Sequence, residues 1–453
     1  MIQKFFLIVL ALIAIAACIA YFVFDGSREV KDLSKVAIFI TPEEYKATDR
    51  VFTLQTTDKG QRKALLPNQF KTGAYTRKPV FMKQEGYVGP ESCKECHAKY
   101  YEGFIQTAHY HTSALANKDS ILGSFEPGEN VMKTKQPGFR FKLEAKEGNF
   151  YQTLLVDEND TTYEHSARFD IVTGSGNVGQ TYLYWQDEFL FQLPVSWISD
   201  GDRWINSPSY PDGLANFARP VNEKCLACHA TNIEFAEKRL NLVNRDHKMI
   251  LGVTCERCHG PAESHVKYHR ENPDANAAKF IVHPNDLSRE RMNDICSQCH
   301  AGGESLLLQP AFSFRPGDPL SSYKRFRPVS DSVGGVHTAN QHPRLVRSEC
   351  YLKSDTMNCA TCHNPHQNEH GNILLFSQRC QKCHEMQDCG QFKTSGTRIG
   401  TNCIDCHMQK KDDTKLEIET EDEVIFPKVR DHFIRVNKEA TQEVLDAWLA
   451  EEK

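Results

Sequence analysis

Seven copies of the pattern Cys-x-x-Cys-His occur along the 453-residue chain, and they limit its possible folds more than any other feature. The cysteine and histidine content alone predicts about 0.03 copies, so the repetition is chemical. Two thiols and an adjacent imidazole can bind zinc, act as a redox dithiol, or attach haem c through two thioether bonds. Numbered in chain order as motifs 1 to 7, the copies are Cys93, Cys96 and His97; Cys225, Cys228 and His229; Cys255, Cys258 and His259; Cys296, Cys299 and His300; Cys359, Cys362 and His363; Cys380, Cys383 and His384; and Cys403, Cys406 and His407.

The repetition favours haem over zinc and over dithiol chemistry. A structural zinc ion needs four protein ligands, usually from two cysteine pairs or from a cysteine pair and a distant histidine pair. Seven groups of three ligands do not combine evenly into such sites. Haem c needs all three residues each time, because the imidazole is the proximal ligand of the iron. The sequence therefore predicts seven covalently bound haems c, whose macrocycles supply much of the apolar core.

The second axial ligand of each iron distinguishes an electron-carrying haem, which has two protein ligands, from a haem that can bind substrate at an open position. Twelve histidines lie outside the motifs, enough for a second imidazole at every iron. The predicted distal ligands are His109 (with His111 as its alternative), His265, His269, His337, His366 and His432, and the reserves are His165, His247, His283, His342 and His370. A histidine three residues past its own proximal ligand cannot easily reach the opposite face of the same haem. We therefore expect His366, and likewise His265, to serve a neighbouring haem, and we assign His432 to motif 7.

An uncharged apolar run from Phe5 to Phe24 lies near the N-terminus. Twenty apolar residues can cross a bilayer, and they exceed the usual apolar core of a cleaved signal peptide. We predict that residues 1–26 form a single-pass anchor in the cytoplasmic membrane, with the haem domain on the periplasmic side. A cleaved signal and a lipid anchor at Cys18, within "IAAC", are alternatives that leave the haem domain on the same side.

Cys18, Cys350 and Cys389 are the three cysteines outside the motifs. In an oxidising compartment Cys350 and Cys389 can form a disulfide, can stay as buried free thiols, or can supply a thiolate to haem iron. The sequence leaves these alternatives open.

The long interval between motifs 1 and 2 has a different character from the rest of the chain. "FRFKLEAKEGNFYQTLLVDE" alternates apolar and polar residues, and "QTYLYWQDEFLFQLPVSW" is aromatic with a central turn, so we predict a β-rich insert at about 138–200. Its aromatic run forms sheet core or, alternatively, a partner surface. Residues 27–89 are interpreted as a linker, 90–436 as the heptahaem domain, and 437–453 as an amphipathic helix capped by Thr441. The predicted fold is mainly α and irregular around haem, with this β-rich insert and the N-terminal transmembrane helix.

Several further segments carry a family resemblance. "TAHYHTS", "GSGNVGQTYLYW", "FQLPVSW", "RWINSPSY", "CLACHAT", "CERCHGPAESH" and "CHNPH" together resemble the membrane-associated multihaem cytochromes c related to the tetrahaem electron carrier of ammonia oxidisers. Those proteins share haem-packing motifs with hydroxylamine oxidoreductase and pentahaem nitrite reductase. The resemblance covers most of Tyr87 to Val436 and implies stacked and perpendicular haem pairs, mostly with two histidine ligands, in an exported protein. The Cys-x-x-Cys-Lys motif that marks the nitrite reductases does not occur in this chain.

Two functions follow from these expectations. The first is a membrane-anchored electron carrier between respiratory partners, either redox proteins or a quinol-oxidising membrane complex. The alternative is a reductase or oxidase of a small nitrogen or sulfur compound at one five-coordinate haem, where Arg257, Arg203 or His247 would polarise the substrate. With a formal net charge of −5 and no basic stripe, the chain is not expected to bind nucleic acid.

Overall fold

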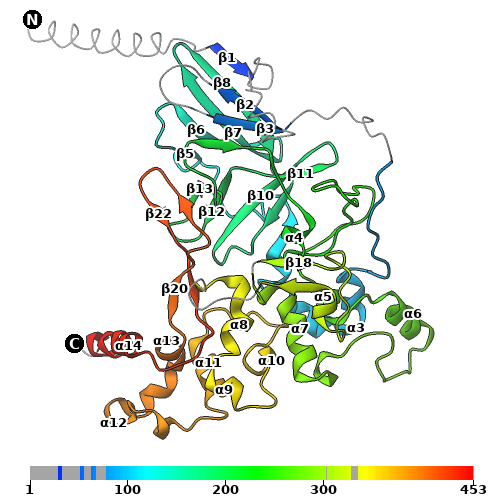
Figure 1. Ribbon diagram of the computed structural model, residues 1–453, viewed down its shortest axis with the longest axis vertical. Coiled ribbons are helices and arrows are strands. Elements are labelled where there is room, and N and C mark those ends of the chain that lie inside the picture. Colours follow the sequence, from blue (N-terminus) through cyan, green and yellow to red (C-terminus); the bar gives the residue numbers. More distant parts are fainter. Residues whose placement is uncertain are drawn as a thin grey trace, which may run out of the picture.

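The computed structural model describes residues 29–32, 51–55, 63–67, 78–302, 304–327 and 335–451. The predicted anchor and Cys18 lie outside these residues. Within the described ranges, no helix is both long and apolar enough to cross a bilayer. Most of the strands gather in one half of the molecule, and the helices that carry the motifs gather in the other (Figure 1). The fold is thus mixed α and β, with a larger β contribution than the sequence predicted.

The first sheet is an antiparallel meander with one parallel strand added at its edge. Along β6, Phe139, Phe141 and Leu143 are buried while their neighbours face outward, because successive side chains of a strand point to opposite faces. The turns after β6 and β7 place Glu147 and Asn159 at positive φ. In spatial order the strands are β1 (Glu29–Asp32), β8 (Thr161–Arg168), β7 (Asn149–Glu158), β6 (Phe139–Lys146) and β5 (Val131–Lys133).

The second sheet buries most of the aromatic run of the insert. Tyr182, Trp197 and Trp204 join Phe139 and Phe141 in one core, so this run forms sheet core rather than an exposed partner surface. Its strands are β13 (Arg203–Asn206), β12 (Val195–Ile198), β10 (Gly179–Gln186), β11 (Phe189–Gln192) and β15 (Arg219–Pro220), with β9 (Ile171–Thr173) on β10 and β4 (Ser113–Leu115) on β9. A third sheet contains β14 (Leu214–Asn216), β3 (Lys63–Pro67) and β2 (Val51–Gln55).

These sheets extend beyond the predicted insert. Their strands that follow motif 1 run from Ser113 to Pro220, where the prediction placed them at about 138–200. The segment interpreted as a linker supplies three strands, of which β1 pairs with β8 and β3 pairs with β14. It therefore contributes to the β-rich half of the molecule.

Every motif lies on or beside a short helix, as expected for haem attachment. Motif 1 lies on α3 (Glu91–Phe104), motif 2 on α4 (Glu223–Leu226) and the turn after it, motif 3 on α5 (Cys255–His259), motif 4 at the end of α7 (Arg289–His300), motif 5 on α10 (Cys359–Cys362), motif 6 at the end of α11 (Ile373–Cys380), and motif 7 on α13 (Cys403–His407). The other helices are α6 (Glu263–Glu271), α8 (Gln341–Leu345), α9 (Glu349–Leu352), α12 (Phe392–Ser395) and α14 (Lys438–Glu451).

The remaining elements are short. The 3₁₀ turns are η2 (Tyr110–Thr112), η3 (Pro284–Asp286), η4 (Leu320–Ser322), η5 (Thr338–Asn340), η6 (Met386–Asp388) and η7 (Gly396–Thr401). Two-stranded ribbons pair β16 (Ala230–Asn232) with β17 (Ile250–Leu251), β18 (Ser305–Leu307) with β19 (Lys324–Phe326), β20 (Lys410–Asp412) with β23 (Lys428–Arg430), and β21 (Ile418–Glu419) with β22 (Val424–Ile425).

Capping asparagines start several of the motif helices. Asn222, Asn358 and Asn402 accept backbone N–H groups in the first turns of α4, α10 and α13, respectively, within two residues of the first cysteine. Asparagine is a preferred cap because its side-chain oxygen satisfies an N–H group that has no partner inside the helix. The C-terminal helix is also capped by asparagine, since Asn437 accepts the N–H of Ala440. The prediction of Thr441 as the cap is therefore wrong.

Candidate haem sites

Four of the seven motif histidines are held in one tautomer by the backbone. A carbonyl oxygen only accepts hydrogen bonds, so an Nδ1 atom that contacts one must carry the proton, which leaves the lone pair on Nε2. This arrangement is common for histidines that ligate metals. The contacts are His229 to Thr112 (3.3 Å), His259 to Val282 (2.9 Å), His300 to Thr338 (2.9 Å) and His407 to Arg435 (3.2 Å).

Four motif histidines face a second imidazole at nearly the same separation. The ring-centre distances are 6.4 Å for His97 and His265, 6.1 Å for His259 and His366, 6.3 Å for His300 and His109, and 6.1 Å for His363 and His432. Three of these pairs have nearly parallel rings, and the pair of His300 and His109 is inclined at 69°. The partners come from distant parts of the chain.

This separation fits an iron atom between the two rings. The bond from a first-row metal to an imidazole nitrogen is about 2 Å, so the ring centre lies about 3 Å from the metal. Two imidazoles on opposite sides of one iron then have centres about 6 Å apart, whereas rings in direct contact can approach more closely. The four pairs therefore have the spacing that bis-histidine haem requires.

Burial keeps several of these imidazoles neutral. Burial, reinforced by neighbouring histidines, lowers the pKa of His109 to about 4. The pKa of His432 is also lowered to about 4, again mainly by burial. Burial likewise lowers the pKa of His259, His363 and His366. A neutral imidazole is the form that binds a metal, so these groups need not lose a proton on coordination at neutral pH.

The other predicted ligands are placed differently. The ring centres of His269 and His265 are 4.6 Å apart, which is too close for an iron atom to lie between the two rings. The Nδ1 atom of His337 accepts the N–H of Ala339, and its Nε2 lies 3.9 Å from Asp413. His432, which we assigned to motif 7, stacks on His363 of motif 5 instead.

Three motif histidines have no such partner. In the part of the chain that the structure describes, no second imidazole lies within stacking distance of His229, His384 or His407. His384 is exposed, whereas His229 and His407 are half-buried and anchored through Nδ1. His229 lies beside the β-rich half, where Thr112 and Ser113 hydrogen-bond its backbone carbonyl.

Cysteine side chains bring the motifs together in pairs. Cys93 of motif 1 interacts with Cys255 of motif 3. Cys228 of motif 2 interacts with Cys299 of motif 4. A third contact joins Cys296 of motif 4 to Cys359 of motif 5. Because these sulfur atoms attach the macrocycle at one edge, each contact would bring the edges of two haems close together.

Cys350 and Cys389 are free, half-buried thiols. The Cys350 thiol lies near Cys362 and Cys383, and burial raises its pKa. Cys389 instead lies near Cys403 and Cys406 of motif 7. The structure therefore contains no disulfide between Cys350 and Cys389.

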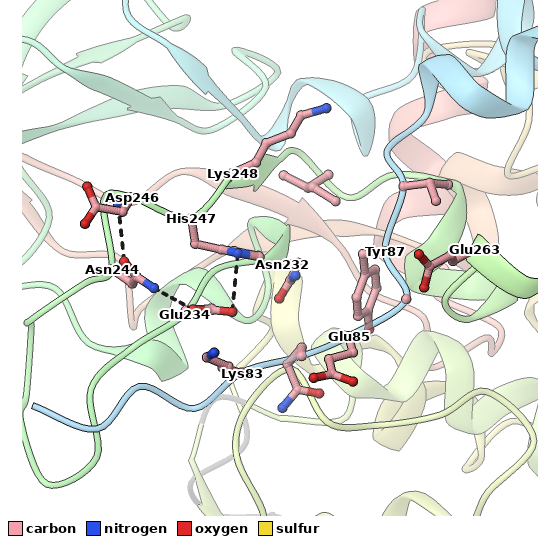
Figure 2. Close-up of a pocket in the computed structure, with 14 residues that line it drawn as sticks. Lys83, Glu85, Tyr87, Asn232, Glu234, Asn244, Asp246, His247, Lys248 and Glu263 are labelled. Carbon is pink, nitrogen blue, oxygen red and sulfur yellow. Dashed lines mark hydrogen bonds and ion pairs between the residues drawn. The ribbon is translucent and has the colours of Figure 1, made fainter.

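A cleft of about 520 Å³ opens between the segment before motif 1 and the segment after motif 2 (Figure 2). Figure 2 shows Glu234 between His247 and Asn244, at 3.4 Å and 2.7 Å, respectively. The side-chain oxygen of Asn232, which also lines the cleft, is buried without a hydrogen-bond partner. His247 is thus engaged by a carboxylate in this cleft.

Arg203, the other group considered for substrate polarisation, lies on β13 and forms an ion pair with Glu423 at 2.6 Å. Both side chains are about half exposed. This ion pair belongs to the β-rich half and does not involve a motif residue.

Two buried residues of motif 3 have structural roles that the sequence did not predict. They are Glu256 and Arg257, the variable residues between its cysteines. Both are almost completely buried, at 1% and 4% exposure. The carboxylate of Glu256 accepts three backbone N–H groups, from Val88, Gly89 and Ala262. Haem attachment does not require any particular residue at the two positions between the cysteines. The occurrence of two opposite charges there, in "CERCH", was the feature of the sequence that could have indicated their role.

Paired thiols on helical turns, anchored imidazoles and iron-sized gaps between rings together define a multihaem c-type cytochrome. Residues 212–260 match the family model described as cytochrome c554 and c-prime, and this segment contains motifs 2 and 3. The chain is therefore a multihaem c-type cytochrome with covalently bound haem c, a class whose members transfer electrons or act as reductases.

Two curated proteins are similar over parts of the chain. The multiheme cytochrome MtrA of Shewanella baltica is 26% identical over 189 residues, which cover 37% of this chain and 54% of that protein. The dissimilatory sulfite reductase MccA of Wolinella succinogenes is 24% identical over 394 residues, which cover 71% of this chain and 50% of that protein. The chain thus spans about half the length of these relatives. The crystal structure of the outer cell wall cytochrome OcwA shares the fold, with a TM-score of 0.50 at 15% identity over 79% of this chain and 82% of that one.

Proposed function

We propose that the chain binds seven haems c and conducts electrons through them between redox partners. The observation that carries this proposal is the contact of cysteines from different motifs, which would bring macrocycle edges close together. Bound haem supplies a one-electron couple at each motif. The protein holds the couples at fixed separations, buries them and sets their potentials.

The cysteine contacts suggest an order for the relay. Cysteines of motifs 1 and 3, of motifs 4 and 5, and of motifs 2 and 4 lie close enough to change each other's pKa. Longer-range electrostatic interactions link Cys258 with Cys296, Cys362 with Cys383, and Cys380 with Cys403. We propose on this basis that the relay runs through motifs 1, 3, 4, 5, 6 and 7, and that motif 2 forms a branch at motif 4.

The imidazole pairs support this role. We propose His265, His366, His109 and His432 as the distal ligands at motifs 1, 3, 4 and 5. Two of them tie neighbouring motifs together, because His265 lies on α6 directly after motif 3 and His366 lies just after motif 5. A bis-histidine iron has no free position for substrate, which suits electron transfer.

We also propose that the haem domain works outside the cytoplasmic membrane, held there by the apolar N-terminal segment. Redox proteins or a quinol-oxidising membrane complex would be its partners. Proteolytic accessibility of the haem domain in intact cells and in spheroplasts tests this location. Digestion only after cell lysis would contradict it.

Pulsed photoreduction of the haem-loaded protein tests the relay. We expect seven haems by mass and pyridine haemochrome analysis, and a transfer of electrons among them at a rate independent of protein concentration. Fewer than seven haems, or equilibration that becomes faster with protein concentration, would contradict the proposal.

A second candidate function is the reduction of a small oxyanion at the haem of motif 2. The specific observation is that His229, like His407 of motif 7, has its Nδ1 anchored but faces no second imidazole among the described residues. The similarity to a protein named as a dissimilatory sulfite reductase also favours this candidate. Ferric spectra with added cyanide, sulfite or nitrite provide the test. A high-spin signal that responds to these ligands supports it, and a wholly low-spin, unresponsive spectrum excludes it.

A further inference from the structure

Arg257 of motif 3 is a buried guanidinium at a point where three motifs meet. Its side chain donates to the carbonyl of Ala227 in motif 2 at 2.9 Å. Its own carbonyl accepts from the side chain of Gln298 in motif 4 at 3.3 Å. The charge is therefore held at the junction of the main relay and its proposed branch.

No carboxylate among the described residues forms an ion pair with Arg257. The guanidinium lies 5.3 Å from the centre of the Phe312 ring, and its Nε is buried without a hydrogen-bond partner. The adjacent Glu256 is engaged by three backbone N–H groups. Burial of an unpaired charge is costly, so a cation in this position indicates a function that benefits from positive potential.

A second cation reaches the same junction. Lys324 on β19 donates to the carbonyl of Gln298 at 2.9 Å. The same Gln298 donates its side-chain N–H to the carbonyl of Arg257, so one residue of motif 4 contacts both basic residues. Arg257 and Lys324 therefore each bind a backbone carbonyl that lies between the two cysteines of a motif, Ala227 in motif 2 and Gln298 in motif 4.

We propose that Arg257 and Lys324 form a cationic junction that raises the reduction potentials of the haems bound by motifs 2 and 4. This inference rests on the proposed electron-transfer function. Each haem accepts one electron from a reduced redox partner, and a fixed positive charge stabilises the reduced form over the oxidised form. The low dielectric constant of the buried site strengthens this effect. The haems of motifs 2 and 4 would therefore be reduced before their neighbours.

The acidic groups of the haems do not cancel these charges. The cysteines attach the macrocycle at its vinyl edge, whereas the propionates project from the opposite edge. At motifs 2 and 4, the two cations hydrogen-bond carbonyls between the paired cysteines and so lie on the cysteine side. Their field is therefore felt mainly at the edge through which neighbouring haems exchange electrons.

Spectroelectrochemical titration of the haem-loaded variants tests the junction. For Arg257→Gln and for Lys324→Gln we expect the one-electron equilibrium of at least one haem to shift about tenfold towards the oxidised form, which lowers its midpoint potential by about 59 mV. Arg257→Lys keeps the charge and should retain most of the wild-type potential. Arg203→Gln, which removes an arginine from the β-rich half, is the matched control and should leave every midpoint unchanged.

Two results would overturn the inference. The first is that every midpoint potential stays unchanged in both Arg257→Gln and Lys324→Gln, while their haem content and low-spin spectra match the wild type. The other is a shift in Arg257→Lys as large as that in Arg257→Gln, because it would show that shape matters and charge does not. Failure of the proposed relay has a different signature, since the wild type itself would lack haems or would not exchange electrons between them.

Discussion

Replacement of Glu256 by glutamine should loosen the connection between motifs 1 and 3. The carboxylate accepts N–H groups from Val88 at 2.9 Å, Gly89 at 2.8 Å and Ala262 at 3.0 Å. The first two residues immediately precede α3, and the third precedes α6, which carries His265. One buried side chain thus connects the helix of motif 1, its proposed distal ligand and motif 3.

The cost of this substitution follows from the number of bonds. A glutamine side chain has one oxygen, so at least one backbone N–H must face its NH₂ group and lose its acceptor. Loss of a hydrogen bond to a charged group, together with a buried unsatisfied donor, costs about 2–3 kcal/mol. We expect Soret circular dichroism to show thermal unfolding of Glu256→Gln several degrees below the wild type.

The matched control is Glu263→Gln, which changes an exposed glutamate close to Glu256 in the sequence. A surface substitution of this kind should change stability by no more than about 0.5 kcal/mol. Equal melting temperatures for Glu256→Gln and Glu263→Gln would refute the reasoning, because the three buried hydrogen bonds would then contribute nothing measurable.

Two further predictions concern ligands and acid stability. His265→Ala and His366→Ala should each convert one haem from low-spin to high-spin in ferric EPR spectra, whereas replacement of the exposed His370 should change none; an unchanged spectrum would remove that histidine from the proposed ligands. Asp431→Asn should lower the free energy of unfolding by about 3–5 kcal/mol at neutral pH, because it removes the carboxylate that lies 2.6 Å from the buried Arg344 guanidinium. Although burial acts to raise it, hydrogen bonds from Arg344 hold the pKa of Asp431 below its usual value, so this stabilisation is present above about pH 4 and is lost as the pH falls further. Denaturant titrations at pH 7 and pH 3 should therefore show a gap between wild type and variant that narrows in acid, and a gap independent of pH would contradict the prediction.

The local parts of the fold were predictable because their causes lie within a few residues. The alternation of apolar Phe139, Phe141 and Leu143 with polar residues predicted a strand, and these side chains are buried in β6. Short strands such as β4 and β14 have only three residues and show no periodic pattern. They form because distant segments offer edges to pair with, which is why the predicted β insert was too short.

The partners of the histidines were not predictable for a related reason. His97 faces His265, and His300 faces His109, across long stretches of intervening chain. Sequence proximity suggested motif 7 for His432, whereas tertiary packing places it against His363. Ring pairing depends on how the motif helices pack, and that packing depends on buried contacts such as those of Glu256, which no local pattern reveals.

A high-resolution structure of the haem-loaded protein tests the central claim most directly. We predict an iron atom between the two imidazoles in each of the four pairs, thioether bonds at all seven motifs, and adjacent macrocycle edges at the three cysteine contacts. An iron that binds only one imidazole of these pairs, or macrocycles held apart at those contacts, would contradict the proposed relay.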